Sequence, residues 1–331
     1  MALKGRMVGH SQLIDLVQDR IAAEPSAKPA EQLLAELVGG ADDPVQAALD
    51  ANEFSEFDLD YDSDEKILFC YFDFAGRPCF TESVLAEARA VQRMARGLFG
   101  ERAETEPPLR YLVLGSRQPG VWNLGGDLEL FAQLIRDRDR AALRRYAHAS
   151  CELGYTNATG LGFDLPIISV ALVQGDALGG GFEAALSSNV IVAERSAKFG
   201  LPEILFNLFP GMGAYTFLTR RVAPGLAERI IMSGELYSAE QLHAMGAVDV
   251  LAPDGQGIAA FYDFIGRGGK RYAALRALYR ARRLVNTVTF EEMTKIADLW
   301  VEAALKLDEA GLKRMLRLVA AQERRTIRTR A

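Results

Sequence analysis

The sequence predicts an α/β protein, and two observations carry this prediction. Short apolar runs rich in β-branched residues alternate along the chain with longer segments whose apolar residues recur at helical spacing. Two of the runs end in glycine turns that lead straight into helix-like segments, at 121–128 and at 167–186. Because an alternation of strands and helices places helices against a sheet, the pattern indicates an α/β core.

Composition narrows the class of protein. The chain has 331 residues, of which 49% are hydrophobic and 25% charged, values typical of globular enzymes. A net charge of −6 disfavours general nucleic-acid binding. No apolar run is long enough to cross a membrane, and residues 1–19 lack the apolar core of a signal peptide. The three cysteines show no paired metal-ligand spacing, so we expect a cytoplasmic protein with no metal or cofactor and no membrane partner.

The first part of the chain is predicted to be an appendage. Residues 1–52 are expected to form an N-terminal extension, partly helical or disordered. Helical spacing is weak at 13–22 and at 31–37, and prolines and glycines, Pro44 among them, interrupt it.

The rest of the chain is predicted to form a core at 53–257 and a helical region at 258–331. The acidic and aromatic stretch at 52–65 is expected to be an edge strand or loop rather than a binding patch. Ser238 and Gln241 form a capping box that opens a helix. Further strands are predicted at 67–72, 111–114, 167–173, 190–193 and 248–251, and further helices at 82–98, 127–134, 140–153, 258–265, 272–285, 291–307 and 311–324.

The stretch from Ile167 to Gly213 organises the chain. A buried strand that enters the glycines at 179–181 and then a helix leaves backbone N–H groups free. Such a helix start attracts an anion or a developing oxyanion. Two acids, Glu183 and Glu203, stand at this helix start and after Pro202. Each glutamate alone could merely favour its helix start, but with both glycine junctions in register the catalytic interpretation is favoured.

Two glycine junctions followed by Pro202-Glu203 resemble the crotonase (enoyl-CoA hydratase/isomerase) superfamily from about residue 66 to 257. The resemblance implies a spiral of ββα units and C-terminal helices that cover the site and build a homotrimer. It places an oxyanion hole at the backbone N–H groups of Gly126 and Gly180, and catalytic acids at Glu183 and Glu203.

The chain is most similar to one branch, the diffusible-signal-factor synthases. The similarity rests on 122–128, 131–136, 200–203, 208–215 and 236–242, and on the helices around Trp300. Members of this branch make cis-2-unsaturated fatty acids for cell–cell signalling. The resemblance implies dehydration of a 3-hydroxyacyl thioester on acyl carrier protein, or on CoA, followed by thioester hydrolysis. The N-terminal extension has no counterpart that we could align.

These residue types suit the dehydration of a thioester. Two N–H donors on the thioester oxygen stabilise an enolate, and two carboxyl groups move the protons. We expect Glu203 to act at the 3-position and Glu183 at the α-carbon, an order that the sequence leaves open. Met212, Trp300 and Leu318 are suggested for the acyl pocket, although such residues at helical spacing are as often plain core.

Two other functions stay open at this point. One is a conventional enoyl-CoA hydratase/isomerase of fatty-acid metabolism, which would leave its product bound as a thioester. The other belongs to a different class: a binding protein that holds a regulatory partner, such as a sensor kinase.

Overall fold

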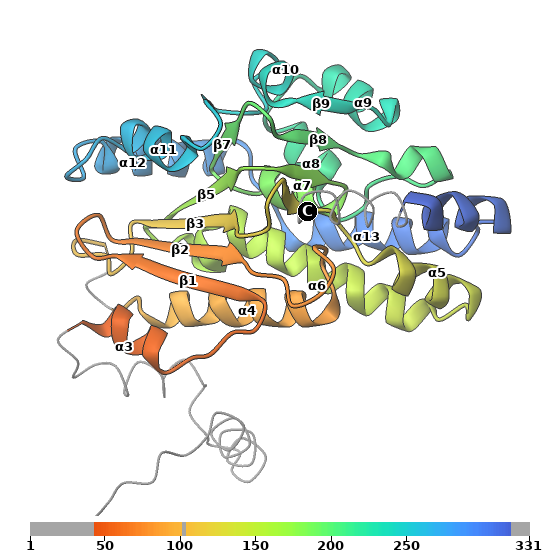
Figure 1. The fold of residues 1–331 in the computed structure, drawn as a ribbon, viewed down its shortest axis with the longest axis horizontal. Coiled ribbons are helices and arrows are strands. Elements are labelled where there is room, and N and C mark those ends of the chain that lie inside the picture. The colour runs from red at the N-terminus through yellow and green to blue at the C-terminus, as the bar shows by residue number, and fades with distance from the viewer. Residues whose placement is uncertain (1–42, 101–103, 319–331) are drawn as a thin grey trace, which may run out of the picture.

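The computed structural model describes residues 43–100 and 104–318 (Figure 1). The helical pieces predicted at 13–22 and 31–37 lie outside the described residues. So does the end of the predicted helix at 311–324. Where the chain divides into folding units stays a prediction.

The strands form two sheets. In the larger sheet five adjacent strands run parallel to one another. The sixth strand, β1, lies at the edge and pairs antiparallel with β2. Across this sheet the order is β1 (Phe57–Asp62), β2 (Ile67–Phe72), β3 (Tyr111–Ser116), β5 (Ile168–Val173), β7 (Val190–Glu194) and β10 (Val250–Ala252). The smaller sheet has the order β4 (Val121–Asn123), β6 (Asp176–Leu178), β8 (Lys198–Gly200) and β9 (Leu236–Ser238).

The chain passes between the two sheets in a repeated way. Strands β3, β5 and β7 belong to the larger sheet, and each is followed by a short strand, β4, β6 or β8, of the smaller one. Helices then follow each short strand: α5 (Leu128–Arg136) and α6 (Arg140–Ala158) after β4, α7 (Gly180–Leu186) after β6, and α8 (Ala214–Leu218) after β8. Helix α4 (Glu82–Gly97) connects β2 to β3. The predicted spiral of ββα units is therefore confirmed.

The larger sheet is buried on both faces. In β2, for example, Leu68, Cys70 and Phe72 pack into one hydrophobic cluster with helices α4 and α6. The alternate residues, among them Phe69, face a second cluster that includes Phe261 and Tyr279. Because successive side chains of a strand point to opposite faces, a parallel strand covered on both sides reads as one apolar run.

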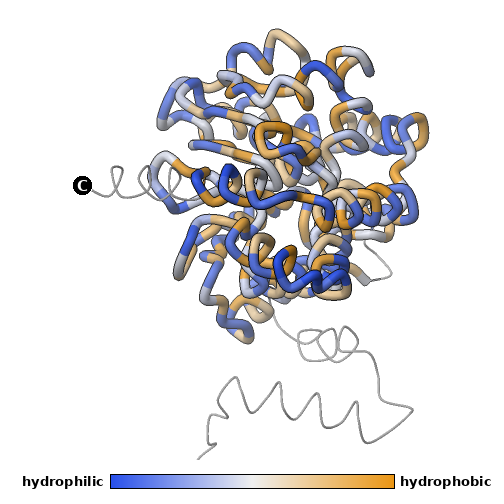
Figure 2. Tube along the Cα trace, turned by 90° about the vertical axis from the view of Figure 1, so that its right-hand side faces the viewer, coloured by the Kyte–Doolittle hydropathy of each residue, from blue (hydrophilic) through white to orange (hydrophobic). Residues whose placement is uncertain are grey.

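Helix ends follow the capping rules. Thr81, Asp127 and Asp139 accept hydrogen bonds from backbone N–H groups at the starts of α4, α5 and α6. The predicted capping box of Ser238 and Gln241 is present at the start of α10 (Ala239–Ala244). Hydrophilic and hydrophobic residues alternate along the helical turns, as expected of helices with one buried side (Figure 2).

The predicted C-terminal helices are present. They are α11 (Gly257–Ile265), α12 (Tyr272–Val285), α13 (Phe290–Ala304) and a helix that begins at residue 309, all preceded by α9 (Pro224–Ser233). Helix α13 packs along α6 (Figure 1). Within 43–100 and 104–318, no helix has the length and apolar character of a membrane span.

Two sequence interpretations need correction. Pro44 does not interrupt structure: it opens α3 (Pro44–Asp50), whose N-cap is Asp43, because the first turn of a helix needs no proline N–H. Val45 and Ala48 of this helix are buried in the main core cluster. The short strands β6 and β8 were not predicted, since three residues are too few to show a period. The stretch at 52–65 does contain the expected edge strand, β1.

We predict that Leu143→Ala lowers the free energy of unfolding by about 2–5 kcal/mol, because it leaves a cavity in the core. Leu143 is fully buried on α6, at 0% exposure. Leu299→Ala is the matched control, since Leu299 is 64% exposed on α13 and its loss should cost less than about 0.5 kcal/mol. Denaturant unfolding of both variants checks the difference, and equal losses would contradict the packing described.

Candidate active site

Two strand-to-helix junctions lie side by side because β4 and β6 pair in parallel. The chain leaves β4 through Gly125 and Gly126, and it leaves β6 through Gly179 into α7. A methyl group placed on Gly180 would lie 3.4 Å from the Gly126 nitrogen. Within the described residues, neither the Gly126 nor the Gly180 N–H donates to a protein acceptor. Two free donors therefore face one small space.

Side chains that the sequence did not single out hold the first junction in place. The Asn123 Oδ1 accepts the N–H of Gly125 at 2.8 Å, and Gly125 has a φ of +94° that favours glycine. The Tyr146 hydroxyl accepts the N–H of Asp127 at 3.3 Å and donates to the Phe80 carbonyl. These bonds fix the direction of the Gly126 N–H.

Glu183 projects from α7 into the protein interior. It is only 4% exposed, and its Oε1 accepts the N–H groups of Met212 and Ala214, both at 2.9 Å. The carboxyl group is thus tied to the start of α8 and to the residues just before it. One turn of α7 separates it from the free N–H of Gly180.

Glu203 stands on the short helix η2 (Pro202–Phe206). A methyl group on Gly179 would lie 2.8 Å from the Glu203 Oε1, and the φ of Gly179 is +50°, so glycine is needed there on both grounds. The Glu203 Oε2 is buried and has no hydrogen-bond partner among the described residues. A buried oxygen of this kind is available to a ligand.

The two carboxyl groups shift each other's ionisation. Burial raises the pKa of Glu183 to about 7, against the opposing effect of the N–H donors at 212–214. Burial, and then the charge of Glu183, raise the pKa of Glu203 to about 8. Because the two groups titrate as a pair, the site near neutral pH holds both a carboxylate and a carboxylic acid.

A cavity leads from these groups into the apolar interior. It has a volume of about 820 Å³, including the part that opens to solvent, and lies between β1–β3 and helices α4 and α6. Its lining contains one charged residue among those described, Glu183. The apolar lining includes Phe57, Cys70, Phe72, Phe80, Leu85, Ala88, Val91, Leu112, Leu114 and Leu153.

A smaller cavity of about 360 Å³ contains both carboxyl groups. Gly126, Gly180, Glu183 and Met212 line this cavity and the larger one, so the donors and one acid lie where the two meet. A thioester held there would have its carbonyl at the N–H groups and its alkyl chain in the larger cavity. This arrangement is suited to proton transfer next to a carbonyl group.

The three residues suggested for the acyl pocket have different locations. Met212 lines both cavities, and Trp300 lines only the smaller one, where its ring packs on Phe131. Leu318 lines neither cavity: it is half-buried at the end of the described helix and packs against the main core. A position at helical spacing cannot distinguish these outcomes, because core and pocket residues share the same pattern.

The chain is similar to known proteins in sequence and in fold. A family model described as enoyl-CoA hydratase/isomerase matches residues 91–261, more than half of the chain. The chain is 43% identical over 91 residues to an Escherichia coli 2,3-dehydroadipyl-CoA hydratase, a match of 28% of this chain and 35% of that relative. It is 28% identical over 159 residues to a human mitochondrial methylglutaconyl-CoA hydratase, a match of 48% of this chain and 44% of that relative.

The matched segments thus span about a third to a half of the length of these curated relatives. Among solved structures, an enoyl-CoA hydratase from Bacillus halodurans has a TM-score of 0.65 at 20% identity, covering 79% of this chain and 99% of that one. Pseudomonas aeruginosa DspI has a TM-score of 0.58 at 21% identity, covering 73% and 91%. These two likenesses establish the fold.

The raised pKa values predict how stability depends on pH. Unfolded glutamates ionise near pH 4.5, whereas the folded pair retains protons up to about pH 7–8. The unfolded state therefore binds fewer protons across this window, and stability falls as pH rises through it. In Glu203→Gln the loss of stability with rising pH should be smaller. The stability of the variant relative to the wild type should therefore increase towards about pH 8.

Thermal unfolding midpoints between about pH 5 and pH 8 measure this effect. Glu228→Gln is the control, since Glu228 is an exposed residue of α9. It should follow the wild-type curve. Parallel curves for Glu203→Gln and the wild type would show that the Glu203 carboxyl group is not held in a buried site.

Proposed function

The chain belongs to the enoyl-CoA hydratase/isomerase family, and we propose that it removes water from a 3-hydroxyacyl thioester to form a 2-enoyl product. One observation carries the proposal. Two buried carboxyl groups, Glu183 and Glu203, share a small cavity with the free N–H groups of Gly126 and Gly180, and an apolar cavity opens from the same point.

The thioester oxygen would lie between the two N–H groups. When the α-proton leaves, negative charge develops on this oxygen, and donors already aimed at it stabilise the enolate. Loss of one such donor typically costs about 3–4 kcal/mol of transition-state stabilisation. A side chain at Gly180 would come within 3.4 Å of the Gly126 nitrogen and so would obstruct the space where the oxygen binds.

The two glutamates would divide the proton transfers. The carboxylate removes the proton from C2, the C3–O bond breaks, and the carboxylic acid donates its proton to the departing hydroxyl, which leaves as water. Glu203 has the higher pKa and suits the acid at C3, whereas the N–H donors at 212–214 favour the ionised form of Glu183 as the base at C2. The reverse reaction, hydration, uses the same groups.

The lining of the larger cavity supports an uncharged alkyl chain as substrate. Dehydroadipyl and methylglutaconyl groups, the acyl groups in the names of the two relatives, each carry a second carboxylate. A buried carboxylate needs a cationic or hydrogen-bonding partner. Among the described lining residues no cationic side chain is available, and most are apolar, although Gln92, Ser150 and Asn157 carry hydrogen-bonding groups.

The finer proposal is that the chain also hydrolyses the thioester, as a synthase of a diffusible cis-2-unsaturated fatty acid signal would. Water would add to the carbonyl carbon, the same N–H groups would hold the tetrahedral oxyanion, and the C–S bond would break to release a thiol and a free acid. The motifs at 122–128, 200–203 and 208–215 support this branch. Acyl carrier protein or CoA as thiol carrier and a homotrimer belong to the same proposal, whereas a role as regulatory binding partner of a sensor kinase is an alternative of another class.

A conventional hydratase is the second candidate. The names of the curated relatives, which are CoA hydratases, favour it. The two candidates share the dehydration step and differ in the fate of the thioester.

Product analysis distinguishes them. The purified protein is incubated with 3-hydroxyacyl thioesters of carrier protein and of CoA over a series of chain lengths, and products are followed by mass spectrometry. Free 2-enoic acid is the expected result. A product that stays entirely thioester-bound would reject the synthase and leave the hydratase, and no turnover of either substrate would reject both.

We predict that Glu183→Gln and Glu203→Gln each lower the rate of dehydration on the order of 10²–10⁴-fold, the usual contribution of one proton-transfer group. Gly180→Ala should lower it by about 10²–10³-fold through loss of oxyanion stabilisation. Rates at saturating substrate measure these effects. Glu228→Gln, remote from both cavities, serves as control and should keep the wild-type rate; a comparable loss there would point to general damage.

A further prediction concerns chain length. Ala88 lines the larger cavity from α4, and Ala88→Leu would fill part of it. The longest thioester turned over efficiently should become shorter, with kcat for short chains unchanged because the carboxyl groups are not touched. A series of chain lengths tests this, and an unchanged length profile would show that the alkyl chain lies elsewhere.

A further inference from the structure

A third cavity, of about 410 Å³, lies at the C-terminal end of α7, where the end of α12 and the turn after α8 meet. Four arginines line it, Arg220, Arg221, Arg282 and Arg283, and its described lining contains no carboxylate. It shares only Ser187 with the lining of the apolar cavity. We propose that this arginine cavity binds a small oxyanion, a phosphate or carboxylate group, independently of the dehydration chemistry.

Three of the arginines are held from outside the cavity by acids. Arg220 pairs with Glu292 at 2.7 Å, and Arg221 pairs with Asp249 at 3.0 Å. Arg283 pairs with Asp164 at 2.7 Å. These pairs fix the direction of each guanidinium group but do not occupy the cavity.

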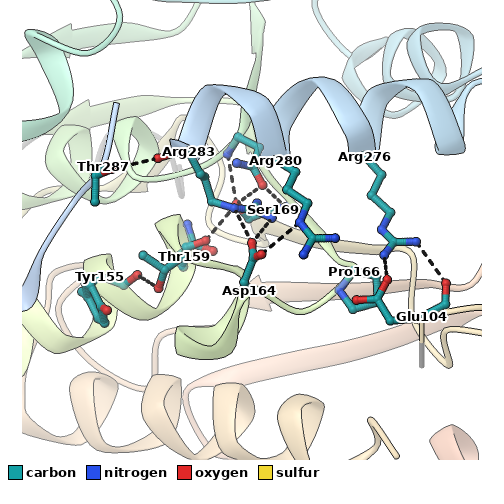
Figure 3. A network of polar contacts seen from close by, with 12 residues as sticks. Glu104, Tyr155, Thr159, Asp164, Pro166, Ser169, Arg276, Arg280, Arg283 and Thr287 are labelled. Atoms are coloured by element: carbon teal, nitrogen blue, oxygen red, sulfur yellow. Dashed lines mark hydrogen bonds and ion pairs between the residues drawn. The ribbon is translucent and has the colours of Figure 1, made fainter. Parts of the chain in front are cut away.

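One acid serves two arginines. Arg280, which lies outside the cavity lining, also pairs with Asp164, at 3.1 Å. Figure 3 shows Arg276, Arg280 and Arg283 along one side of α12, with Arg280 and Arg283 both reaching Asp164. Asp164 therefore balances only part of the positive charge that α12 brings to this region.

Arg282 has no carboxylate partner among the described residues. It donates to the Asn189 carbonyl, and its guanidinium group lies 4.7 Å from the centre of the Tyr279 ring. Burial and the neighbouring charge of Arg221 lower the pKa of Arg282, and the charge of Asp249 offsets this only in part. A buried cation next to a second cation is unfavourable unless an anion compensates it.

An unpaired donor lies on the same cavity wall. The Nε of Arg220 is buried and has no hydrogen-bond acceptor within the described ranges. Buried donors without a partner are rare in proteins, and an unbound ligand is one explanation for them. Arg220 and Arg282 together supply donors from two segments that are far apart in sequence.

Capping of helix ends explains only part of the cluster. Arg221 donates to the carbonyls of Leu186 and Ser188, where α7 ends. Backbone carbonyls are dipoles, so they do not neutralise a full charge on Arg282 as well. The planar guanidinium fork binds two oxygens of one phosphate or carboxylate, which fits the chemistry of the cavity.

Calorimetric titration tests the proposal. The full chain is titrated with inorganic phosphate and, separately, with acetate at constant ionic strength, and the two arms distinguish the two sources of oxyanion. Saturable binding of at least one anion is expected. Arg282→Gln should weaken it about ten- to a hundredfold, the effect of losing one charged hydrogen-bonding group.

Arg280→Gln is the matched control, because Arg280 lies on the same helix as Arg282 but outside the cavity lining, where it pairs with Asp164. It should retain wild-type affinity. Without anion, Arg282→Gln should unfold at the wild-type temperature or above, since it removes a buried charge without orphaning an acid. Absence of binding by the wild type, or equal weakening in both variants, would overturn the proposal whatever the enzyme assays show.

Discussion

Two backbone N–H groups hold the Glu183 carboxyl group inside the protein, and the rest of the site depends on this contact. Of the donors, Met212 lies in the segment that follows Glu203 and precedes α8, and Ala214 is the first residue of α8. One carboxyl group therefore joins α7 to the segment that carries its partner acid. Because burial and these donors act on the pKa in opposite directions, the group stays close to the balance between its two protonation states.

Much of the fold could be predicted from the sequence because its strongest signals are local. The run at 67–72 is apolar throughout, which is typical of a parallel strand buried on both faces, and the structure has β2 over those residues. The capping box at Ser238 could also be predicted, because it involves the residues of a single helix turn. Helix α3 shows the limit: proline is read as a breaker, yet at the first turn it starts the helix.

Only part of the candidate site could be predicted from the sequence. Glycine junctions and acids mark the reacting end, because glycines with positive φ and buried carboxyl groups are costly without a purpose. The residues that hold Gly125 and Gly126 in place, Asn123 and Tyr146, carry no comparable signal. Nor do the cavity residues on α4 and β3, since an apolar side chain beside a void has the same sequence pattern as one beside another side chain. Leu318 as an acyl-pocket residue stays a prediction, and it lines neither of the two cavities described at the acids.

The edge strand β1 has a consequence for how this scaffold can diversify. Phe57, its first residue, lines the larger cavity. The N–H groups of Ser55 and Glu56, just before it, bind the Glu87 carboxylate of α4. In the proposed function, β1 would contact the alkyl chain but would carry none of the groups that move protons. Replacement of the residues around β1 would therefore change which substrates fit the cavity without changing the acids and the glycines.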